Sequence, residues 1–162
     1  MKILIKKGGT GDIALIEDLA RRSWPVSYGD ILSEKQIVFM LEDIYSSAAL
    51  ARAMNQGQVF YILFSDGLAV GFMALITVQG VLRIEKLYLL PQVQGQGLGK
   101  RLIDYAESVC QNYGLAALEL NVNRRNKAYS FYLKQGFRVL YEVDIPYHGF
   151  VLDDYVMRKD LH

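Results

Sequence analysis

The sequence predicts a mixed α/β fold, and three observations support this. Stretches with strand and helix patterns follow one another in the order β-α-α-α-β-β-β-α-β-α-β-β, which is not the regular alternation of a Rossmann fold. Short turn signals join several strands directly, as in antiparallel meanders. One long amphipathic helix separates two strands, as a central crossover does. A chain of 162 residues suits one domain, which we expect over residues 1–162.

The first 57 residues are predicted to hold one strand and three helices. The strand covers residues 1–7, and the helices cover 13–22, a segment from near 33, and about 47–55. Ser33 and Gln36 fit a capping box for the second helix. Residues 23–30 include Pro25 and the only tryptophan, and we expect this segment to end the first helix.

The rest of the chain is predicted to be mostly strands. We expect strands at 58–64, 68–78, 81–90, 116–122, 137–145 and 150–159. A hairpin turn is expected at 65–67, and a loop at 146–149 is expected to join the last two strands. Gly71 marks a β-bulge or a close approach of another backbone. A short helix at 125–135 ends at a glycine.

The composition excludes several classes of protein. A hydrophobic fraction of 52% indicates a globular chain, and a net charge of +1 gives no general attraction to nucleic acid or to a membrane. The single cysteine, Cys110, excludes an internal disulfide and suits a reducing compartment. No apolar run approaches the roughly 20 residues that span a bilayer. We therefore expect a cytoplasmic protein, and we expect no bound metal.

The stretch at residues 87–103 carries the strongest functional signal. Pro91 ends an apolar strand, and Gly95, Gly97 and Gly99 then alternate with larger residues. Helical spacing of apolar residues begins there, at Leu98, Leu102, Ile103, Ala106 and Val109. The first N–H groups of a helix lack internal acceptors, so a glycine loop at this point is suited to a phosphate group. The alternative is a glycine-rich turn with no ligand.

Two common phosphate motifs do not fit this stretch. A Walker loop needs Ser or Thr after Gly-Lys, whereas Arg101 follows Lys100. A dinucleotide fingerprint needs two residues between its last glycines, and only one stands between Gly97 and Gly99. Glu119 lies at about the distance of a ribose-binding acid, so a dinucleotide-binding oxidoreductase stays as a weaker alternative.

The stretch does resemble one known motif. Gln94-x-x-Gly97-x-Gly99 after Pro91 is similar to the acetyl-CoA diphosphate loop of the GCN5-related N-acetyltransferase (GNAT) superfamily. Residues 126–137, from Asn126 to a Gly-Phe pair, resemble a second segment of that superfamily. The motifs cover about residues 82–138. The resemblance implies a seven-stranded, V-shaped mixed sheet, split between its fourth and fifth strands and flanked by four to five helices.

The resemblance also implies where acetyl-CoA binds. The pantetheine arm would pair with the backbone of Leu87, Tyr88 and Leu89, as an added strand does. Asn126 would help to hold the arm, although an asparagine there is also a typical helix cap. The N–H groups expected to hold the diphosphate belong to Gln94, Gly95, Gln96, Gly97, Leu98, Gly99 and Lys100.

The implied reaction is direct attack of an amine on the thioester. Tyr132 aligns with the tyrosine that protonates the leaving thiolate in this superfamily; otherwise it is helix packing. Some members carry a fifth-strand glutamate as base, but that position is Asn121 here. Glu85 lies two residues before Leu87 on the same strand face, and we expect it to accept the amine proton directly or through water, unless it is a surface carboxylate. Glu119 is a weaker substitute.

The amine acceptor is expected to contact aromatic residues outside the motifs. Trp24, Tyr28 and Tyr147 would suit a cationic amine, or else they form a tyrosine-rich surface or a dimer contact. The Trp-Pro-x-x-Tyr segment resembles, less closely, the polyamine-acetylating bacterial branch of the superfamily. We therefore predict an N-acetyltransferase for a small, polyamine-like amine or a peptide amine, and we expect a homodimer. The alternative is a non-catalytic sensor that binds a CoA-type nucleotide.

Overall fold

A computed structural model describes residues 1–161 of the protein. The chain forms two compact units, and we describe each by itself. The first consists of Met1–Ile76 with Glu85–Leu102, and the second of Thr77–Ile84 with the chain from Ile103 onward. Strands β3 (Leu68–Val78) and β4 (Val81–Leu89) and helix α4 (Leu98–Asn112) pass from one unit into the other.

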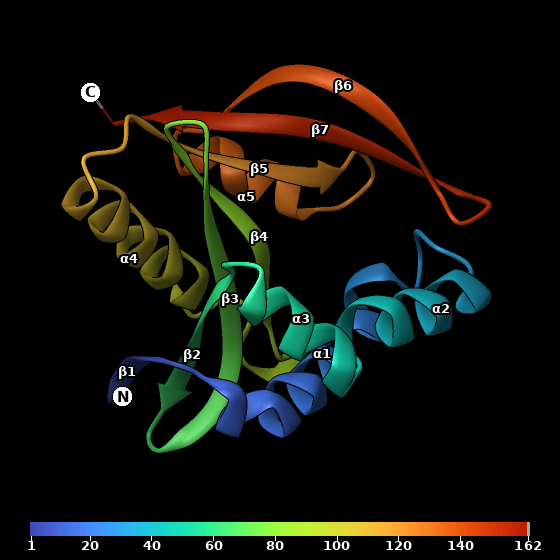
Figure 1. Ribbon diagram of the computed structural model, residues 1–162, viewed down its shortest axis with the longest axis horizontal. Helices are drawn as coiled ribbons and strands as arrows, with labels where there is room; N and C mark the ends of the chain where they lie inside the picture. The colour runs from blue at the N-terminus through green and yellow to red at the C-terminus, as the bar shows by residue number, and fades with distance from the viewer. Residues whose placement is uncertain (162) are drawn as a thin grey trace. The chain divides into compact units, whose positions relative to one another are not determined.

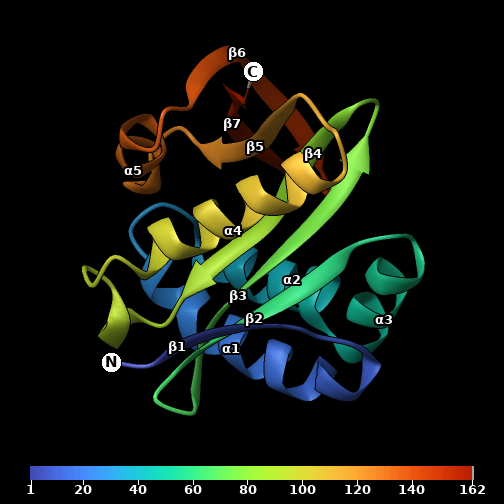
Figure 2. The same cartoon turned by 90° about the vertical axis from the view of Figure 1, so that its left-hand side faces the viewer.

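Three strands and three α-helices make up most of the first unit. Strand β2 pairs antiparallel with β1 on one side and with β3 on the other. Helices α1, α2 and α3 gather on one side of these strands (Figures 1 and 2). The helices and strands that lie wholly in this unit are β1 (Ile3–Lys7), η1 (Thr10–Asp12), α1 (Ile13–Tyr28), α2 (Glu34–Tyr45), α3 (Ser47–Asn55), β2 (Val59–Ser65) and η2 (Pro91–Val93).

The core of the first unit lies between these strands and helices. Large apolar side chains from both layers are almost completely buried, and each contributes roughly 1.5–3 kcal/mol through burial. They include Ile16, Leu19, Leu50, Phe60, Leu63, Phe72, Met73 and Leu75. The expected cap of the second helix is confirmed, since Ser33 Oγ accepts the Gln36 N–H at 3.1 Å.

The expected end of the first helix near residue 23 is wrong, because α1 continues to Tyr28 with Pro25 inside it. Proline removes one helical hydrogen bond, but Ile16, Ala20, Trp24 and Tyr28 stand four residues apart and so share one face. Trp24 is 3% exposed and packs on Tyr28, with ring centroids 4.5 Å apart. Burial of this aromatic face therefore outweighs the lost bond.

The second unit is built around three strands. Strand β5 (Ala117–Asn123) pairs parallel with β4 and antiparallel with β7 (Phe150–Asp160). Strand β6 (Arg138–Tyr147) pairs antiparallel with β7, and helix α5 (Ala128–Lys134) connects β5 to β6. The seven strands have the order β1-β2-β3-β4-β5-β7-β6. Over residues 1–161 this mixed sheet and the five α-helices confirm the predicted fold class.

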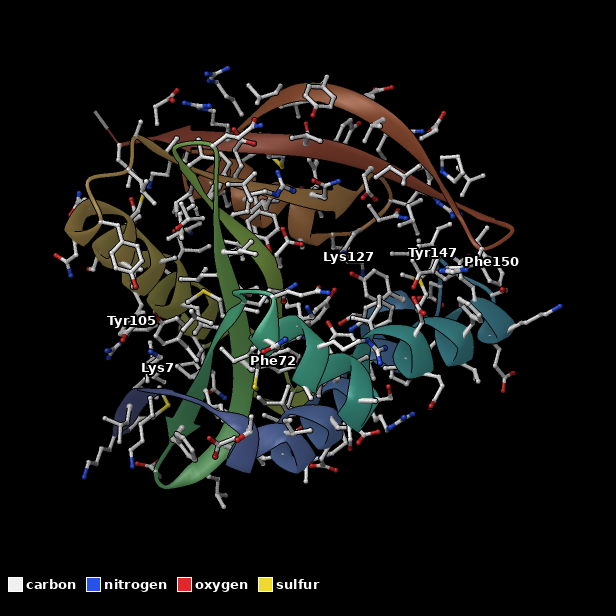
Figure 3. The ribbon with its side chains drawn as sticks, in the orientation of Figure 1. Lys7, Phe72, Tyr105, Lys127, Tyr147 and Phe150 are labelled. Atoms are coloured by element: carbon white, nitrogen blue, oxygen red, sulfur yellow. The ribbon has the colours of Figure 1, made fainter. Side chains whose placement is uncertain are left out.

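The last hairpin is tighter than expected. Strand β6 continues through Pro146 and Tyr147, so the predicted loop at 146–149 shrinks to His148 and Gly149. Both residues have positive φ, 47° and 85°, as a two-residue type I′ turn requires. Proline fits in β6 because this strand lies at the sheet edge. Tyr147 and Phe150 form the last strand pair, and Figure 3 shows them at the tip of the hairpin.

No helix in the described part of the chain combines the length and apolar character that a membrane crossing needs.

Candidate active site

The second half of β4 presents two different faces. Because side chains alternate along a strand, Lys86 and Tyr88 point to one side and Glu85, Leu87 and Leu89 to the other. Glu85 is exposed, whereas Leu87, Tyr88 and Leu89 are half-buried. This alternation agrees with the expectation that Glu85 shares a face with Leu87.

Strand β3 lies very close to this part of β4. The Leu90 N–H donates to the Val70 carbonyl oxygen at 2.8 Å. A Cβ at Gly71 would stand 2.7 Å from the Tyr88 carbonyl oxygen and 2.6 Å from Leu89 Cδ2, shorter than any normal contact. The close approach predicted for Gly71 is confirmed, and a β-bulge lies beside it where the β2–β3 register shifts at Leu63. A side chain at position 71 would therefore push this part of β4 away from β3.

The glycine loop adopts the conformation that its sequence predicts. Gly95 and Gly97 have φ values of 80° and 77°, in the left-handed region that favours glycine. A Cβ on either residue would meet no atom within 4 Å, so space opens beside this backbone. Gln94, Gly95, Gln96 and Gly97 are all exposed, as an approaching anion requires.

Helix α4 begins directly after this loop. The Arg101 N–H donates to the Gly97 carbonyl oxygen at 3.3 Å, which makes Gly97 the residue that caps the helix. The N–H groups of Leu98 and Gly99 precede this first bond, so they have no acceptor within the helix. The Leu98 side chain is 2% exposed and anchors the helix start in the protein. Main-chain N–H groups and the positive end of the helix dipole therefore meet at the exposed loop.

An aromatic cluster in the first unit includes two of the residues predicted to bind the acceptor. The Trp24 ring lies 5.6 Å from the Tyr88 ring, and the Tyr28 and Tyr88 hydroxyl oxygens are 2.8 Å apart. Tyr45 joins the cluster between Trp24 and Phe72, with ring centroids 5.6 Å and 5.9 Å away. The structure thus brings Trp24 and Tyr28 against Tyr88 of the predicted cofactor strand.

Tyr45 was not identified from the sequence. It is 1% exposed, and burial raises its pKa well above the ordinary value for tyrosine. It stands four residues after Leu41 on the buried face of α2, so the helical spacing of apolar residues could have identified Tyr45 as buried. Trp24 is also buried, so much of its surface serves packing.

Lys86 is a second residue that sequence analysis missed. Its side chain is buried, its Nζ donates to Gln58 Oε1 at 2.5 Å, and Nζ lies 5.3 Å and 5.9 Å from the ring centroids of Phe60 and Tyr45. Burial lowers its pKa to about 8. In the sequence, the position of Lys86 two residues before Tyr88, on the same face of the strand, could have indicated that its side chain is buried.

In the second unit, Tyr132 lies on the buried face of α5. It is 7% exposed, and its ring packs against those of Phe131 and Phe137, with centroids 5.3 Å and 5.6 Å apart. Asn126 Oδ1 accepts the Ala128 N–H at 2.9 Å, so Asn126 does hold the start of α5. Within residues 1–161 its Nδ2 makes no hydrogen bond, which leaves that donor for a ligand.

Asn121 belongs to a polar network on β5. Its Oδ1 accepts a short hydrogen bond from the Arg83 guanidinium, and its Nδ2 donates to Asp154 Oδ2 at 3.2 Å. Glu119 forms salt bridges with Arg83 at 3.3 Å and with Arg158 at 3.0 Å. Both guanidinium groups thus hold Glu119 in an ion-pair network on these strands.

Tyr147 belongs to the second unit, whereas Trp24 and Tyr28 belong to the first. Its ring lies edge-on to His148, with centroids 4.8 Å apart, and its part in acceptor binding stays a prediction. Among residues 1–161, no group of three or more His, Cys, Asp or Glu side chains is arranged to hold a metal ion. Cys110 is buried, and burial raises its thiol pKa, which fits the packing role expected for it.

Comparison with known proteins identifies the family. Residues 30–159 match the model of the Acetyltransferase (GNAT) domain. The chain is a GNAT acetyltransferase. This membership confirms the resemblance found in the sequence, and it displaces the dinucleotide-binding oxidoreductase as an alternative.

This GNAT acetyltransferase has a relative with a named amine substrate. It is 31% identical, over 145 residues, to the spermidine N(1)-acetyltransferase of Thermoplasma acidophilum, covering 86% of this chain and 90% of that protein. A crystal structure of the PaiA N-acetyltransferase from the same organism in complex with coenzyme A superimposes with a TM-score of 0.85 at 30% identity, over 99% of each chain. A GNAT structure from Rhodopseudomonas palustris has the same TM-score at 23% identity and shows the shared fold.

The residues present fit a CoA thioester. The exposed N–H groups at the start of α4 and the left-handed glycines suit a diphosphate, and the backbone of Leu87–Leu89 is the expected partner of an extended arm. Lys100, exposed in the first turn of α4, adds positive charge there.

Proposed function

We propose that this protein transfers the acetyl group of acetyl-CoA to a primary amine of a small, polyamine-like molecule or of a peptide. The single observation that carries this is the exposed glycine loop, which passes through left-handed Gly95 and Gly97 into the N-terminus of α4. The spermidine acetyltransferase of T. acidophilum, at 31% identity, favours a polyamine over other amines.

The diphosphate of acetyl-CoA is proposed to bind the N–H groups from Gln94 to Lys100. The pantetheine arm then extends along Leu87, Tyr88 and Leu89, and Asn126 Nδ2 donates to the arm. A main-chain N–H of this strand also stabilises the thioester oxygen as negative charge develops on it. The acetyl group supplied by the coenzyme is the electrophile that the amine attacks.

Two side chains are proposed to move protons. Tyr132 donates its hydroxyl proton to the departing thiolate, an effect worth roughly 10²-fold or more. The family motif supports this role, and the fixed ring of Tyr132 between Phe131 and Phe137 supports a defined hydroxyl position. Glu85, exposed on β4, is proposed to receive the amine proton through a water molecule.

The acceptor amine is proposed to contact Trp24, Tyr28 and Tyr147. Aromatic faces attract ammonium groups, by about 0.5–1 kcal/mol at an exposed site and more after desolvation. Tyr28 is half-buried at the end of α1 and also offers a hydroxyl oxygen as acceptor. A cationic, flexible polyamine is the acceptor that such residues favour.

Location and assembly complete the proposal. We propose a cytoplasmic protein, which a buried, unpaired cysteine supports. A homodimer is proposed as well, and light scattering of the purified protein would decide between one and two chains.

The test has two stages. Thermal unfolding is first measured with acetyl-CoA, CoA and NAD in parallel, and we expect stabilisation by the first two alone; stabilisation by NAD alone would overturn the proposal. Thiol release from acetyl-CoA is then followed with spermidine, a simple monoamine and a lysine-containing peptide. Release that depends on an amine is the expected result. Binding of acetyl-CoA without thiol release for any amine would favour the non-catalytic sensor instead.

A further inference from the structure

The last turn of helix α1 has two different sides. Trp24 and Tyr28 lie on the inner side, where Trp24 is 3% exposed and the two ring centroids are 4.5 Å apart. Pro25 and Gly29, each one position later in the chain, are exposed. The Tyr28 carbonyl oxygen accepts the Leu32 N–H at 2.9 Å, so the chain turns directly after Gly29. The aromatic side and the exposed side therefore belong to one closed turn.

The backbone conformation of Gly29 does not itself require a glycine. Its φ and ψ are −57° and −32°, the values of an ordinary helical residue, which any L-amino acid adopts without strain. At such a position alanine normally stabilises a protein relative to glycine, because glycine loses more conformational freedom on folding. The reason for a glycine at this position therefore lies in the space around it.

The space beside Gly29 is closed by the main chain. A Cβ at this position would stand 2.5 Å from the Pro25 carbonyl oxygen and 3.7 Å from the Pro25 carbonyl carbon. No side-chain rotation relieves this contact, because it joins a Cβ to a main-chain oxygen. The ring of Pro25 also fixes one of the two backbone torsions of that residue. The last turn can thus close this tightly only because Gly29 has no side chain.

Tyr28 lies directly before Gly29, and the position of its hydroxyl depends on this closure. The Tyr28 and Tyr88 hydroxyl oxygens are 2.8 Å apart. Hydrogen bonds between hydroxyl groups span about 2.5–3.0 Å, so a small displacement of the Tyr28 main chain is enough to lengthen this bond beyond its range. The contact on the exposed side of the turn therefore controls a hydrogen bond on the aromatic side.

We propose that Gly29 is a positioning residue for the acceptor site. By letting the last turn of α1 close on the Pro25 carbonyl, it sets the Tyr28 hydroxyl at bonding distance from Tyr88. This inference rests on the proposed function, in which Tyr28 contacts the acceptor amine. Gly29 acts through Tyr28 and not by contact with either substrate. All the residues of this arrangement belong to the first unit.

The first experiment compares Gly29→Ala with Gly11→Ala in the full-length protein. Gly11 lies just before α1, is also exposed, and a Cβ there would meet no atom within 4 Å. With saturating acetyl-CoA, Gly29→Ala should raise KM for spermidine roughly five-fold, the loss expected for one neutral hydrogen bond, with little change in kcat or acetyl-CoA affinity. Gly11→Ala should keep the wild-type KM. An unchanged KM in Gly29→Ala would contradict the proposal.

A double-mutant cycle shows whether Gly29 acts through Tyr28. If it does, Gly29→Ala has no further effect once the Tyr28 hydroxyl is absent. The double variant with Tyr28→Phe should then raise KM about five-fold, as each change does alone. Independent effects would instead multiply to roughly 25-fold. Such a product would show that Gly29 affects acceptor binding by another route, and it would overturn the proposed role.

The only tryptophan of the chain gives a readout that needs no reaction. Trp24 is buried and packs on Tyr28, so opening of the last turn should bring its ring into contact with water. We expect the fluorescence emission of Gly29→Ala to shift to longer wavelength, and that of Gly11→Ala to match the wild type. Unshifted emission in Gly29→Ala would show that the turn keeps its geometry, against the proposal.

The outcomes separate this inference from the function on which it rests. If the wild type releases no thiol with spermidine, the monoamine or the peptide, the proposed function fails, and the emission spectra alone decide whether Gly29 positions Tyr28. If it acetylates one of the other two amines, KM is measured for that amine. Thermal unfolding is recorded for each variant. Should Gly29→Ala unfold near the assay temperature, kinetics and emission are compared at a lower temperature, at which it is folded, and the same results decide.

Discussion

The hydroxyl oxygens of Tyr28 and Tyr88 lie 2.8 Å apart, so one of them donates a hydrogen bond to the other. Tyr28 ends helix α1, whereas Tyr88 stands on the strand that is proposed to hold the coenzyme arm. The pair therefore links the helix expected to contact the acceptor to the strand expected to contact the donor. The Trp24 ring packs against both tyrosines and fixes this arrangement.

Tyr28→Phe should weaken acceptor binding. Loss of one neutral hydrogen bond corresponds to about 1 kcal/mol, or roughly a five-fold rise in KM for spermidine. The aromatic ring stays, so kcat and acetyl-CoA affinity should change little. Steady-state kinetics with spermidine as the varied substrate measure this. Tyr113→Phe, at a tyrosine that is 59% exposed, is the control; equal KM values for both variants would remove Tyr28 from the acceptor site.

Gly97→Ala should weaken acetyl-CoA binding through the backbone. At a φ of 77° an alanine costs about 1–2 kcal/mol, and relief of this strain turns the N–H groups of the loop. Gly67→Ala is a matched control, because Gly67 has a φ of 85°, lies in a hairpin turn and also has open space at its Cβ. Both variants should unfold at a lower temperature. Calorimetric titration should show a loss of affinity, about ten-fold, for Gly97→Ala alone; a similar loss in both would indicate a global effect.

Tyr132→Phe should separate binding from turnover. The ring keeps its packing with Phe131 and Phe137, so stability and acetyl-CoA affinity should stay near wild type. Loss of the proton donor should lower kcat by roughly 10²-fold. Tyr129→Phe changes a tyrosine of the same helix that packs against Tyr155, and it should leave kcat unchanged. An unaltered kcat in Tyr132→Phe would exclude this hydroxyl as the acid.

Lys86 should make stability depend on pH. Its folded pKa of about 8 lies below the unfolded value of 10.5, so the unfolded chain binds more protons between these values. The free energy of unfolding should therefore rise as pH increases from 8 toward 10, by an amount on the order of 3 kcal/mol if the full shift is realised. Below pH 8 the cost of burying the charge is fully present.

Lys86→Met should remove this rise and stabilise the protein at pH 7. Denaturant unfolding of wild type and variant between pH 7 and pH 10 measures the difference. Lys35→Met on the exposed face of α2 serves as control. A constant difference between wild type and Lys86→Met over this range would show that Lys86 keeps its proton in the folded state.

The sequence predicted those features that depend on neighbouring residues. The cap at Ser33 and the hairpin turn at Asp66 and Gly67 follow from local chemistry, and both are present. The glycine loop could also be predicted, because positive φ at Gly95 and Gly97 and the start of a helix are local properties. The continuation of α1 through Trp24 and Tyr28 was not predicted, because Pro25 is a local signal for a helix end, whereas burial of the aromatic side chains depends on tertiary packing.

Features that depend on distant residues could not be predicted. Asn121 meets Asp154 because β5 and β7 pair in a register that aligns Asn123 with Asp154, and these strands are far apart in sequence. Lys86 finds Gln58 through the packing of β4 in the first unit. Gly71 was recognised as a site of close approach, but its partners, the backbone of Tyr88 and the side chain of Leu89, required the structure.

The most direct test of the central claim is a crystal structure of this protein with coenzyme A. We expect the diphosphate oxygens to accept hydrogen bonds from the N–H groups between Gln94 and Lys100, at the start of α4. A coenzyme whose diphosphate binds elsewhere on the protein, with these N–H groups facing water, would contradict the account.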